Sequence, residues 1–475
     1  MIYKCPDSVT QRKYIILVLI LVLISSCNTV IPDAKPRRLK VSDNHRFLST
    51  ENDDPFFWLG DTGWLLFTKL TREETEKYLE DRRQKGFNVI QVMVLHNLKQ
   101  AVNVYGDSAL IDNRIDQPKI TPGSSFEDPA GYDFWDHIDY VIDLAGKKGL
   151  YMALVPVWGS NVRAGMVTRM QAEKYAAWIA DRYHDRTNVI WLNGGDVHGS
   201  DSTGVWNTIG TTIKQANKDQ LITYHPFGRT QSSEWFHNEA WLDFNMFQSG
   251  HRRYDQDTAG RAYGEDNWRY ASVDYSLFPV KPTIDGEPSY EGIPQGLHDT
   301  TQPFWTDSDV RRYAYWSVFA GCFGFTYGHS SVMQFYRKSD NPGYGAKEHW
   351  DIALNAHGAS QMQYLKQLML DKPYFSRVPA NDLIASPQGI KYDYIAVTRS
   401  DDHIFAYTCN GSEIRLKVNL LPSSKYKIAW FDPRKGTTTN TGVSISADEN
   451  SGYTTFDPPG EKQSGNDWVL ILEKI

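Results

Sequence analysis

Eight short apolar runs recur along most of this 475-residue chain, and each run ends in glycine or polar residues. The intervening segments include several with helical periodicity. Residues 132–148, for example, place apolar side chains on one helical face and end at Gly149. Strands that alternate with helices form parallel sheets, and eight such units close into a barrel. The sequence therefore predicts an α/β fold that begins with a (β/α)8 TIM barrel.

The expected barrel strands are residues 55–62, 87–95, 150–158, 188–196, 221–226, 244–248, 280–287 and 323–328. The pattern changes after residue 375, where short β-rich runs are separated by turns rich in Asn, Gly, Ser and Pro. Such runs are typical of a small antiparallel β-sandwich. We therefore expect a catalytic barrel over residues 46–375 and a β-sandwich domain over residues 376–475.

The amino-terminal residues indicate export. Arg12 and Lys13 precede an apolar stretch that ends in Ile24-Ser-Ser-Cys27. The stretch is short for a membrane span and has the proportions of a signal peptide. Its end resembles the lipobox of bacterial lipoproteins, which implies lipidation of Cys27, a signal peptide over residues 1–27 and a linker over 28–45. An ordinary signal peptide or an uncleaved anchor is the alternative, and export follows in either case. As a lipoprotein the protein is expected in the periplasm or at the outer membrane.

Composition narrows the classes of partner. The net charge of −7 and the lack of a long basic run argue against nucleic-acid binding. Aromatic residues make up 13% of the chain, which favours carbohydrate binding because aromatic faces stack on sugar rings, although large cores also use Trp and Tyr. Cys322 and Cys409 fall in different predicted domains and are expected to be free, buried thiols. No Cys or His spacing indicates a zinc site.

Two acidic residues follow predicted buried strands. Asp196 ends the run Asn188–Gly195, and Glu287 ends the run Lys281–Gly286. Parallel barrels keep their active sites at the carboxyl ends of their strands. The two acids lie 91 positions apart, which matches three barrel units of about 31 residues each. We therefore expect them to face each other across one pocket, whereas either acid alone could be a loop carboxylate that caps a helix.

A pair of carboxylates across a barrel mouth suits glycoside hydrolysis. One carboxyl group protonates the leaving oxygen, while the other attacks or stabilises the sugar cation. Burial and the neighbouring anion should raise the pKa of the acid, so that it holds a proton near neutral pH. A carboxyl separation of about 5 to 5.5 Å predicts retention of configuration, and about 6.5 to 9.5 Å predicts inversion.

Further polar and aromatic residues stand at the predicted strand ends. Sugar recognition combines placed polar groups with aromatic platforms. The candidate substrate-binding residues are Asp61, Trp64, His96, Asn97, Trp158, His198, His225, Gln248, Tyr290 and Tyr327. A metal site built from His96, His198 and His225 has no ligand spacing in its favour, so we expect neither a metal nor an organic cofactor.

Four barrel segments together resemble a known family. They are Phe57–Trp64, Gly86–Val92, Asn193–Asp196 and Asp285–Glu291, and they resemble the apiosidase-like glycoside hydrolases of glycoside hydrolase family 140. The resemblance covers roughly residues 45–370. The tail contains Trp430-Phe-Asp-Pro433, Pro458-Pro-Gly460 and Asp467-Trp468, and it resembles a domain of these proteins that is described as collagen-binding. A sandwich beside a barrel more often serves as a structural brace.

The resemblance implies a bacterial enzyme that cleaves apiose-linked side chains of the plant pectin rhamnogalacturonan II. It also implies that Asp196 is the catalytic acid/base and Glu287 the nucleophile of a retaining mechanism. Related retaining barrels usually present Asn-Glu at the fourth strand, whereas here two glycines separate Asn193 from an aspartate. Two alternatives stay open: a glycosidase for another plant β-glycoside, and a non-catalytic carbohydrate-binding surface lipoprotein.

Overall fold

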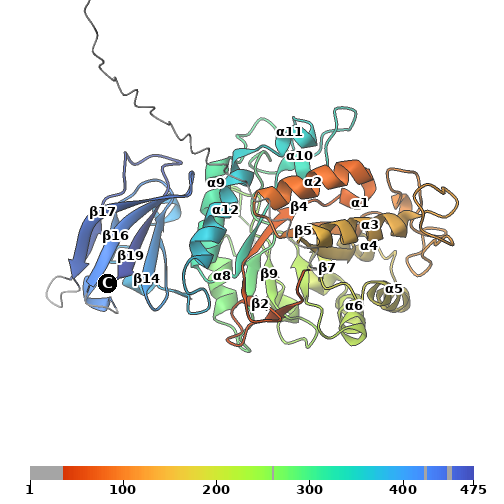
Figure 1. Cartoon of the computed structure of the whole chain (residues 1–475), viewed down its shortest axis with the longest axis horizontal. Coiled ribbons are helices and arrows are strands. Elements are labelled where there is room, and N and C mark those ends of the chain that lie inside the picture. The colour runs from red at the N-terminus through yellow and green to blue at the C-terminus, as the bar shows by residue number, and fades with distance from the viewer. Residues whose placement is uncertain (1–35, 259–260, 422–424, 447–451) are drawn as a thin grey trace, which may run out of the picture. The chain divides into compact units, whose positions relative to one another are not determined.

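The computed structural model describes residues 36–258, 261–421, 425–446 and 452–475 (Figure 1). The predicted signal peptide, with Cys27, and the first part of the predicted linker lie outside the described residues. Among the helices that the structure describes, none has both the length and the apolar character needed to cross a membrane.

Eight parallel strands form the first sheet. They are β4 (Trp58–Thr62), β5 (Val89–Leu95), β6 (Tyr151–Val157), β7 (Val189–Val197), β8 (Ile222–Pro226), β9 (Asn245–Phe247), β10 (Thr283–Asp285) and β11 (Gly324–Tyr327). Their order is β8-β7-β6-β5-β4-β11-β10-β9, and every paired neighbour is parallel. The end strands meet where the Asp243 amide donates to the Ile222 carbonyl, 2.9 Å away. The sheet is therefore a nearly closed barrel, which confirms the predicted fold.

The helices of this domain are α1 (Leu66–Lys69), α2 (Arg72–Gln84), α3 (Phe134–Lys147), α4 (Gly159–Arg163), α5 (Arg169–Arg182), α6 (Thr203–Ala216), α7 (Ser233–Phe236), α8 (Trp268–Tyr275), α9 (Asp307–Phe319), α10 (Ser330–Met333), α11 (Trp350–Ala353) and α12 (His357–Leu370). Both faces of the strands are buried. On β6, Ala153 and Val155 join one apolar cluster and Met152 and Leu154 join another, as the two-residue period of a strand requires. This two-sided burial explains why the strands are continuous apolar runs in the sequence.

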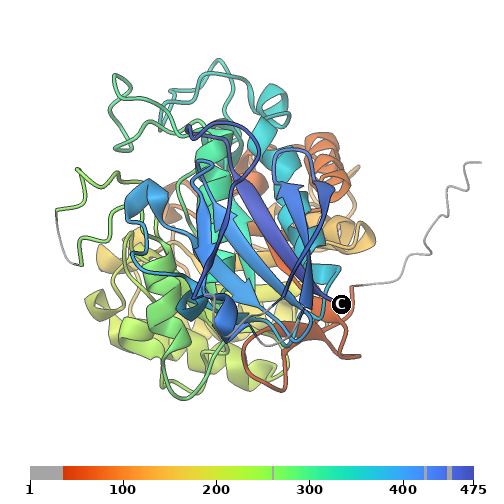
Figure 2. The same cartoon turned by 90° about the vertical axis from the view of Figure 1, so that its left-hand side faces the viewer.

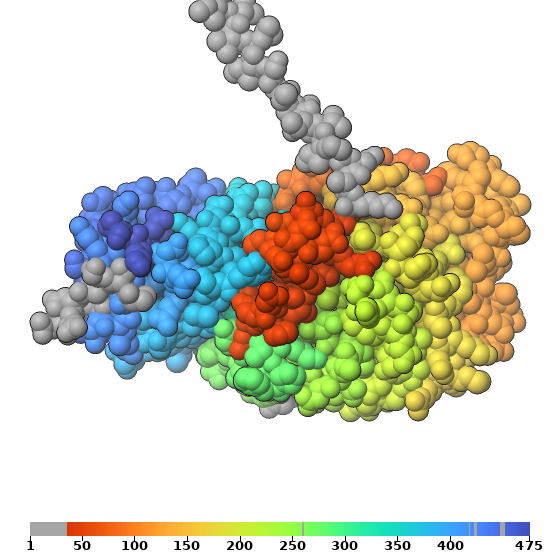
Figure 3. Space-filling model, turned by 60° about the horizontal axis from the view of Figure 1, so that its bottom comes forward, coloured from red at the N-terminus to blue at the C-terminus, as the bar shows by residue number. Residues whose placement is uncertain are grey.

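A small antiparallel sheet precedes the barrel. It comprises β1 (Leu39–Val41), β2 (Leu48–Thr50) and β3 (Pro55–Phe56), and β1 lies inside the segment that we expected to be a linker. Next to this sheet, Thr187 donates to the Pro36 carbonyl at 2.5 Å and Arg38 pairs with Asp219 at 2.8 Å. Thr187 and Asp219 precede β7 and β8, so the segment leading into the sheet contacts the amino ends of the barrel strands. Figure 3 shows the described amino-terminal residues in red.

The C-terminal domain is antiparallel. One sheet has the order β12 (Val378–Pro379), β13 (Ala396–Arg399), β14 (His403–Thr408), β19 (Trp468–Lys474), β16 (Lys425–Asp432) and β17 (Thr437–Ser446) (Figure 2). A second sheet pairs β15 (Ile414–Leu416) with β18 (Thr454–Phe456). Apolar side chains from both sheets share one core. This arrangement confirms the predicted β-sandwich.

Barrel helix α9 packs against the C-terminal domain. Arg311 forms two 2.9 Å hydrogen bonds to the carboxylate of Asp467, and both side chains are at most 2% exposed. Next to this pair, the rings of Tyr315 and Tyr407 stack with their centroids 4.6 Å apart. One apolar cluster runs from the barrel into the sandwich. These contacts fit the expectation that the sandwich braces the barrel.

Candidate active site

A cavity of about 280 Å³ lies at the carboxyl ends of the barrel strands. Its lining comes from many strand ends and from the loops that follow them: Trp64, Leu65, Met93, His96, Trp158, Asp196, Gln248, His251, Glu287, Ile293, Leu297, Met333, Gln334 and Tyr344. Both candidate catalytic acids, Asp196 and Glu287, line it.

The backbone of the Asn-Gly-Gly-Asp segment directs Asp196. Gly194, Gly195 and Asp196 all have positive φ, at 93°, 107° and 51°, and the pairing of β7 with β8 shifts register there. A Cβ atom at position 195 would lie 2.5 Å from the Trp158 ring, and one at position 194 would lie 2.7 Å from the His225 carbonyl oxygen. Glycine is therefore required at both positions. The resulting bulge bends the end of β7 and places the short aspartate side chain at the cavity.

The two acids are close together. An oxygen of Asp196, a ring nitrogen of His225 and an oxygen of Glu287 all lie within 4.8 Å of one another. So close an approach of two carboxylate oxygens favours a retaining pair, whose carboxyl groups lie about 5 to 5.5 Å apart, over an inverting pair. Among the described residues, these three side chains also form the one cluster with metal-ligand geometry, and it contains neither His96 nor His198.

Two imidazoles hold Glu287 in its charged form. His225 and His251 each place Nε2 3.2 Å from a different oxygen of this carboxylate. Burial alone would raise the pKa of Glu287, but these contacts outweigh it and lower the pKa to about 2. Burial also opposes the charged form of His225, yet its contact with Glu287 raises the His225 pKa above its ordinary value. Glu287 is therefore ionised across the physiological pH range.

The pKa of Asp196 is shifted in the opposite direction to that of Glu287. Burial and the negative charge of Glu287 raise its pKa to about 7, although His225 and a hydrogen bond from Gln248 act in the other direction. The two carboxyl groups in one cavity thus have pKa values that are pushed far apart. This split separates a proton donor from an anion that can act as nucleophile.

Several predicted binding residues do lie at this cavity. Trp64, His96, Trp158 and Gln248 line it, and the Trp64 and Trp158 rings pack with their centroids 5.4 Å apart. His225 lies behind the acids, 5.3 Å from the Trp64 ring. These side chains offer an aromatic wall and polar groups to a sugar.

Tyr290 supports the site from a buried position. Its ring meets the His251 imidazole edge-on at 4.9 Å, and its hydroxyl accepts a 3.1 Å hydrogen bond from Thr62. Tyr290 thus helps to orient His251, and it does not line the cavity.

Asp61 and Tyr327 do not reach the cavity. The carboxylate of Asp61 is fully buried and accepts hydrogen bonds from Tyr78 at 2.6 Å and from Arg82 at 2.7 Å, both on α2. The Tyr327 hydroxyl donates to Glu291 at 2.7 Å. Successive side chains of a strand point to opposite faces. These two point out of the barrel, so the prediction that they bind substrate is not supported.

Asn97 and His198 also lie outside the cavity lining. Asn97 accepts a 3.0 Å hydrogen bond from the Lys99 amide and so caps a short turn. The His198 ring packs against Phe227, with centroids 4.8 Å apart. Both residues follow strands, but their side chains satisfy local contacts.

His251 is the most important residue that sequence reasoning missed. It follows Gln248 by three positions, so extending the same strand end would have found it. The apolar lining was also missed. Ile293 and Leu297 come from the loop after β10, while Met333 and Tyr344 come from the segment after β11. Such loops carry no periodic pattern that marks which side chains turn inward.

The chain matches the family model for the apiosidase-like catalytic domain over residues 42–376. It belongs to the apiosidase-like family. Residues 378–473 match a second model, described as "Putative collagen-binding domain of a collagenase".

Solved structures agree with this assignment. One glycoside hydrolase is 44% identical, with a TM-score of 0.85, over 92% of this chain and 97% of the other. A glycoside hydrolase family 5 protein from Bacteroides vulgatus is 40% identical, also with a TM-score of 0.85, over 92% and 93% of the two chains. No curated protein matches the chain. The apiosidase-like chain is a glycoside hydrolase, and its substrate is a carbohydrate.

Proposed function

We propose that this apiosidase-like protein hydrolyses apiosyl linkages in the side chains of rhamnogalacturonan II with retention of configuration. The observation that carries the proposal is the acid pair: oxygens of Asp196 and Glu287 lie within 4.8 Å, with pKa values of about 7 and about 2. A short separation and a split pKa are what a retaining pair requires.

The proposed reaction has two displacements. The Glu287 carboxylate attacks the anomeric carbon while Asp196 donates its proton to the glycosidic oxygen, which leaves as an alcohol. The sugar is then esterified to Glu287. In the second step Asp196, now ionised, takes a proton from water, and the water oxygen attacks the anomeric carbon and releases Glu287. His225 and His251 keep Glu287 charged and oriented throughout.

The cavity supports a small terminal sugar as substrate. Its volume of about 280 Å³ is at the lower end of the ~300–1,000 Å³ of ligand pockets. Leu65, Ile293, Leu297 and Met333 give it an apolar wall. A branched pentose has fewer hydroxyl groups to satisfy than a hexose, so it suits this wall. The match to the apiosidase-like family favours apiose among such sugars.

A panel of plant glycans tests the substrate. We expect the protein to release apiose-terminated side chains from rhamnogalacturonan II fragments, identified by chromatography and mass spectrometry of the products. If rhamnogalacturonan II stays intact while another β-glycoside in the panel is hydrolysed, that β-glycoside is the substrate on which the same acid pair acts. If no member of the panel releases reducing sugar, the proposed activity on rhamnogalacturonan II is refuted.

The pH dependence of kcat/KM follows from the two acids. The first displacement needs Asp196 protonated and Glu287 ionised, so activity should fall as the pH rises through about 7 and as it falls toward about 2. Gln248→Leu removes a hydrogen bond that lowers the Asp196 pKa, so the alkaline limb should move to higher pH. If the alkaline limb of the Gln248→Leu variant is unchanged, titration of Asp196 does not cause the fall in activity at high pH.

We also propose that the protein is exported to the periplasm or the outer membrane as a lipoprotein. The support is the sequence alone: Arg12-Lys13, the apolar stretch and Ile24-Ser-Ser-Cys27. Metabolic labelling with an alkyne fatty acid should label the wild type and spare Cys27→Ser, and an unlabelled membrane fraction would contradict the anchor.

A further inference from the structure

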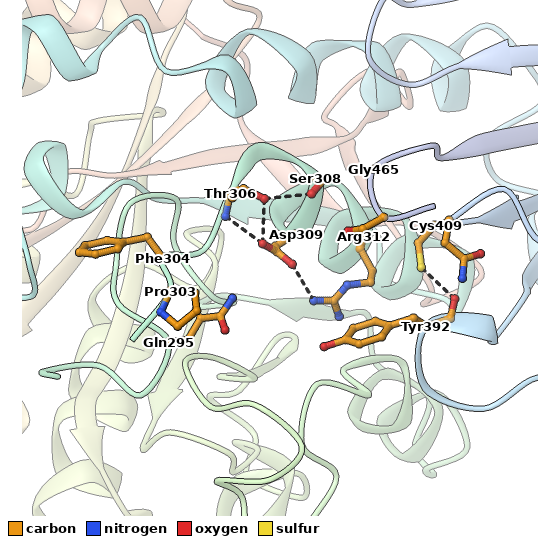
Figure 4. A pocket seen from close by; sticks show the side chains of 12 residues that line it. Gln295, Pro303, Phe304, Thr306, Ser308, Asp309, Arg312, Tyr392, Cys409 and Gly465 are labelled. Atoms are coloured by element: carbon orange, nitrogen blue, oxygen red, sulfur yellow. Dashed lines mark hydrogen bonds and ion pairs between the residues drawn. The ribbon is translucent and has the colours of Figure 1, made fainter. Parts of the chain in front are cut away.

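A second cavity, of about 450 Å³, lies where loops of the barrel domain meet the C-terminal domain (Figure 4). We refer to it as the junction cavity. Its lining consists of Gln295, Pro303, Phe304, Thr306, Ser308, Asp309 and Arg312 from the barrel domain and Tyr392, Cys409, Asn410, Ser464 and Gly465 from the C-terminal domain. It shares no lining residue with the catalytic cavity and is the larger of the two.

We propose that the junction cavity binds a neutral sugar unit of an oligosaccharide. Its lining combines aromatic and polar side chains in the way that saccharide sites do. Tyr392 is 45% exposed, whereas Phe304 is partly exposed and carries the Lys347 Nζ over one face of its ring, 3.4 Å from the centroid. Gln295 contributes an amide and Ser464 an exposed hydroxyl, whereas the Asn410 amide already donates to Asp393.

A buried guanidinium supplies an unused donor. Arg312 is 3% exposed, and its Nη2 pairs with Glu265 at 2.7 Å and with Asp309 at 3.3 Å. Figure 4 shows the guanidinium between Asp309 and Tyr392. Its Nη1 has no hydrogen-bond partner within the described part of the chain. A buried donor without a partner costs free energy. This atom has less than 1 Å² of accessible surface, so a sugar hydroxyl oxygen would bond it only after the neighbouring side chains shift.

The charges favour a neutral ligand over an acidic one. Arg312 is the one basic residue of the lining, and the carboxylates of Glu265 and Asp309 both contact it. Two carboxylates therefore contact the Arg312 guanidinium, and the Lys347 ammonium over the Phe304 ring is a further cation beside the lining. A uronic acid would add a third carboxylate to this group, and like charges at short distance repel. A neutral pentose or hexose carries no such penalty.

One loop separates the two cavities. Ile293 and Leu297 line the catalytic cavity, whereas Gln295 and Pro303 line the junction cavity. The loop folds back on itself, because the backbone N–H of Gln295 donates to the backbone carbonyl of Pro303 at 2.8 Å. A branched oligosaccharide held at the junction cavity could thus extend across this loop toward the acids. This positioning role rests on the proposed function, but sugar binding at the junction cavity does not.

Filling the junction cavity tests the inference. Ser464→Trp adds bulk at an exposed rim position, and Ser444→Trp makes the same change at an exposed position of β17 in the same domain. We would titrate each protein calorimetrically with α-1,5-arabinotetraose, β-1,4-galactotetraose and trigalacturonate. The wild type and Ser444→Trp should bind at least one neutral probe, and Ser464→Trp should bind it at least tenfold more weakly. Hydrolysis of a small aryl glycoside should be the same in all three.

Three results would overturn the inference: neither neutral probe binds the wild type, trigalacturonate binds more tightly than both, or Ser464→Trp binds as the wild type does. Should Ser464→Trp melt at a lower temperature than the wild type, Gln295→Ala replaces it, because this change trims the barrel side of the same cavity. A protein that binds the neutral probe but hydrolyses no glycan would refute the proposed function and leave the junction site standing.

Discussion

Glu287→Gln is expected to lower kcat by about 10⁴-fold or more, which corresponds to about 5 kcal/mol of transition-state stabilisation. The amide keeps the size of the side chain but cannot form the glycosyl ester. Steady-state kinetics on a rhamnogalacturonan II fragment and on an aryl glycoside would measure the loss. Glu291→Gln is a matched control, because Glu291 bonds Tyr327 and the Gly358 amide outside the cavity, and it should keep near wild-type kcat.

Asp196→Asn should lower kcat by roughly 10²–10⁴-fold on the glycan, the range for a lost general acid. The loss in kcat/KM should be smaller on an aryl glycoside, since a good leaving group needs little protonation. Equal losses on both substrates would contradict the acid role. Full activity of both Asp196→Ala and Glu287→Ala would refute the whole assignment.

Asp467→Ala is expected to cost about 3–5 kcal/mol of stability, because it leaves the Arg311 guanidinium buried without its main partner. Thermal and urea unfolding would measure this cost. Asp457→Ala removes an exposed aspartate of the same domain and should change stability by no more than about 0.5 kcal/mol.

The double variant Arg311→Met, Asp467→Leu tests the reason for that cost. Replacing both charges with apolar groups should recover much of the stability, since neither a buried arginine nor a buried aspartate then stays unpaired. Asp307 also loses its partner Arg311, but its side chain is 32% exposed. An Asp467→Ala protein as stable as the wild type would show that this ion pair does not brace the barrel.

The barrel could be predicted from the sequence because its strands are buried on both faces. Each predicted strand is present, with bounds that differ by three residues at most. The pairing of Asp196 with Glu287 followed from the same pattern, because strand ends of a parallel barrel converge. The sheet of β1, β2 and β3 was missed, since strands of two or three residues have no measurable periodicity.

The face of the strand decides which of the predicted binding residues reach the cavity. Trp158 and Gln248 point into the cavity, while Asp61 points outward to Arg82. Position at a strand end does not say which face a side chain occupies, because a shift of one residue reverses it. The role of the two glycines before Asp196 also needed the structure, because only the neighbouring Trp158 ring and His225 carbonyl show why no side chain fits there.

The anomeric configuration of the first product tests the central claim most directly. Proton NMR of the wild-type reaction, recorded before the released sugar equilibrates, distinguishes the two outcomes. Oxygens of Asp196 and Glu287 within 4.8 Å predict that the sugar first appears in the configuration of the glycoside. A first product of opposite configuration would mean that water, and not Glu287, attacks the anomeric carbon.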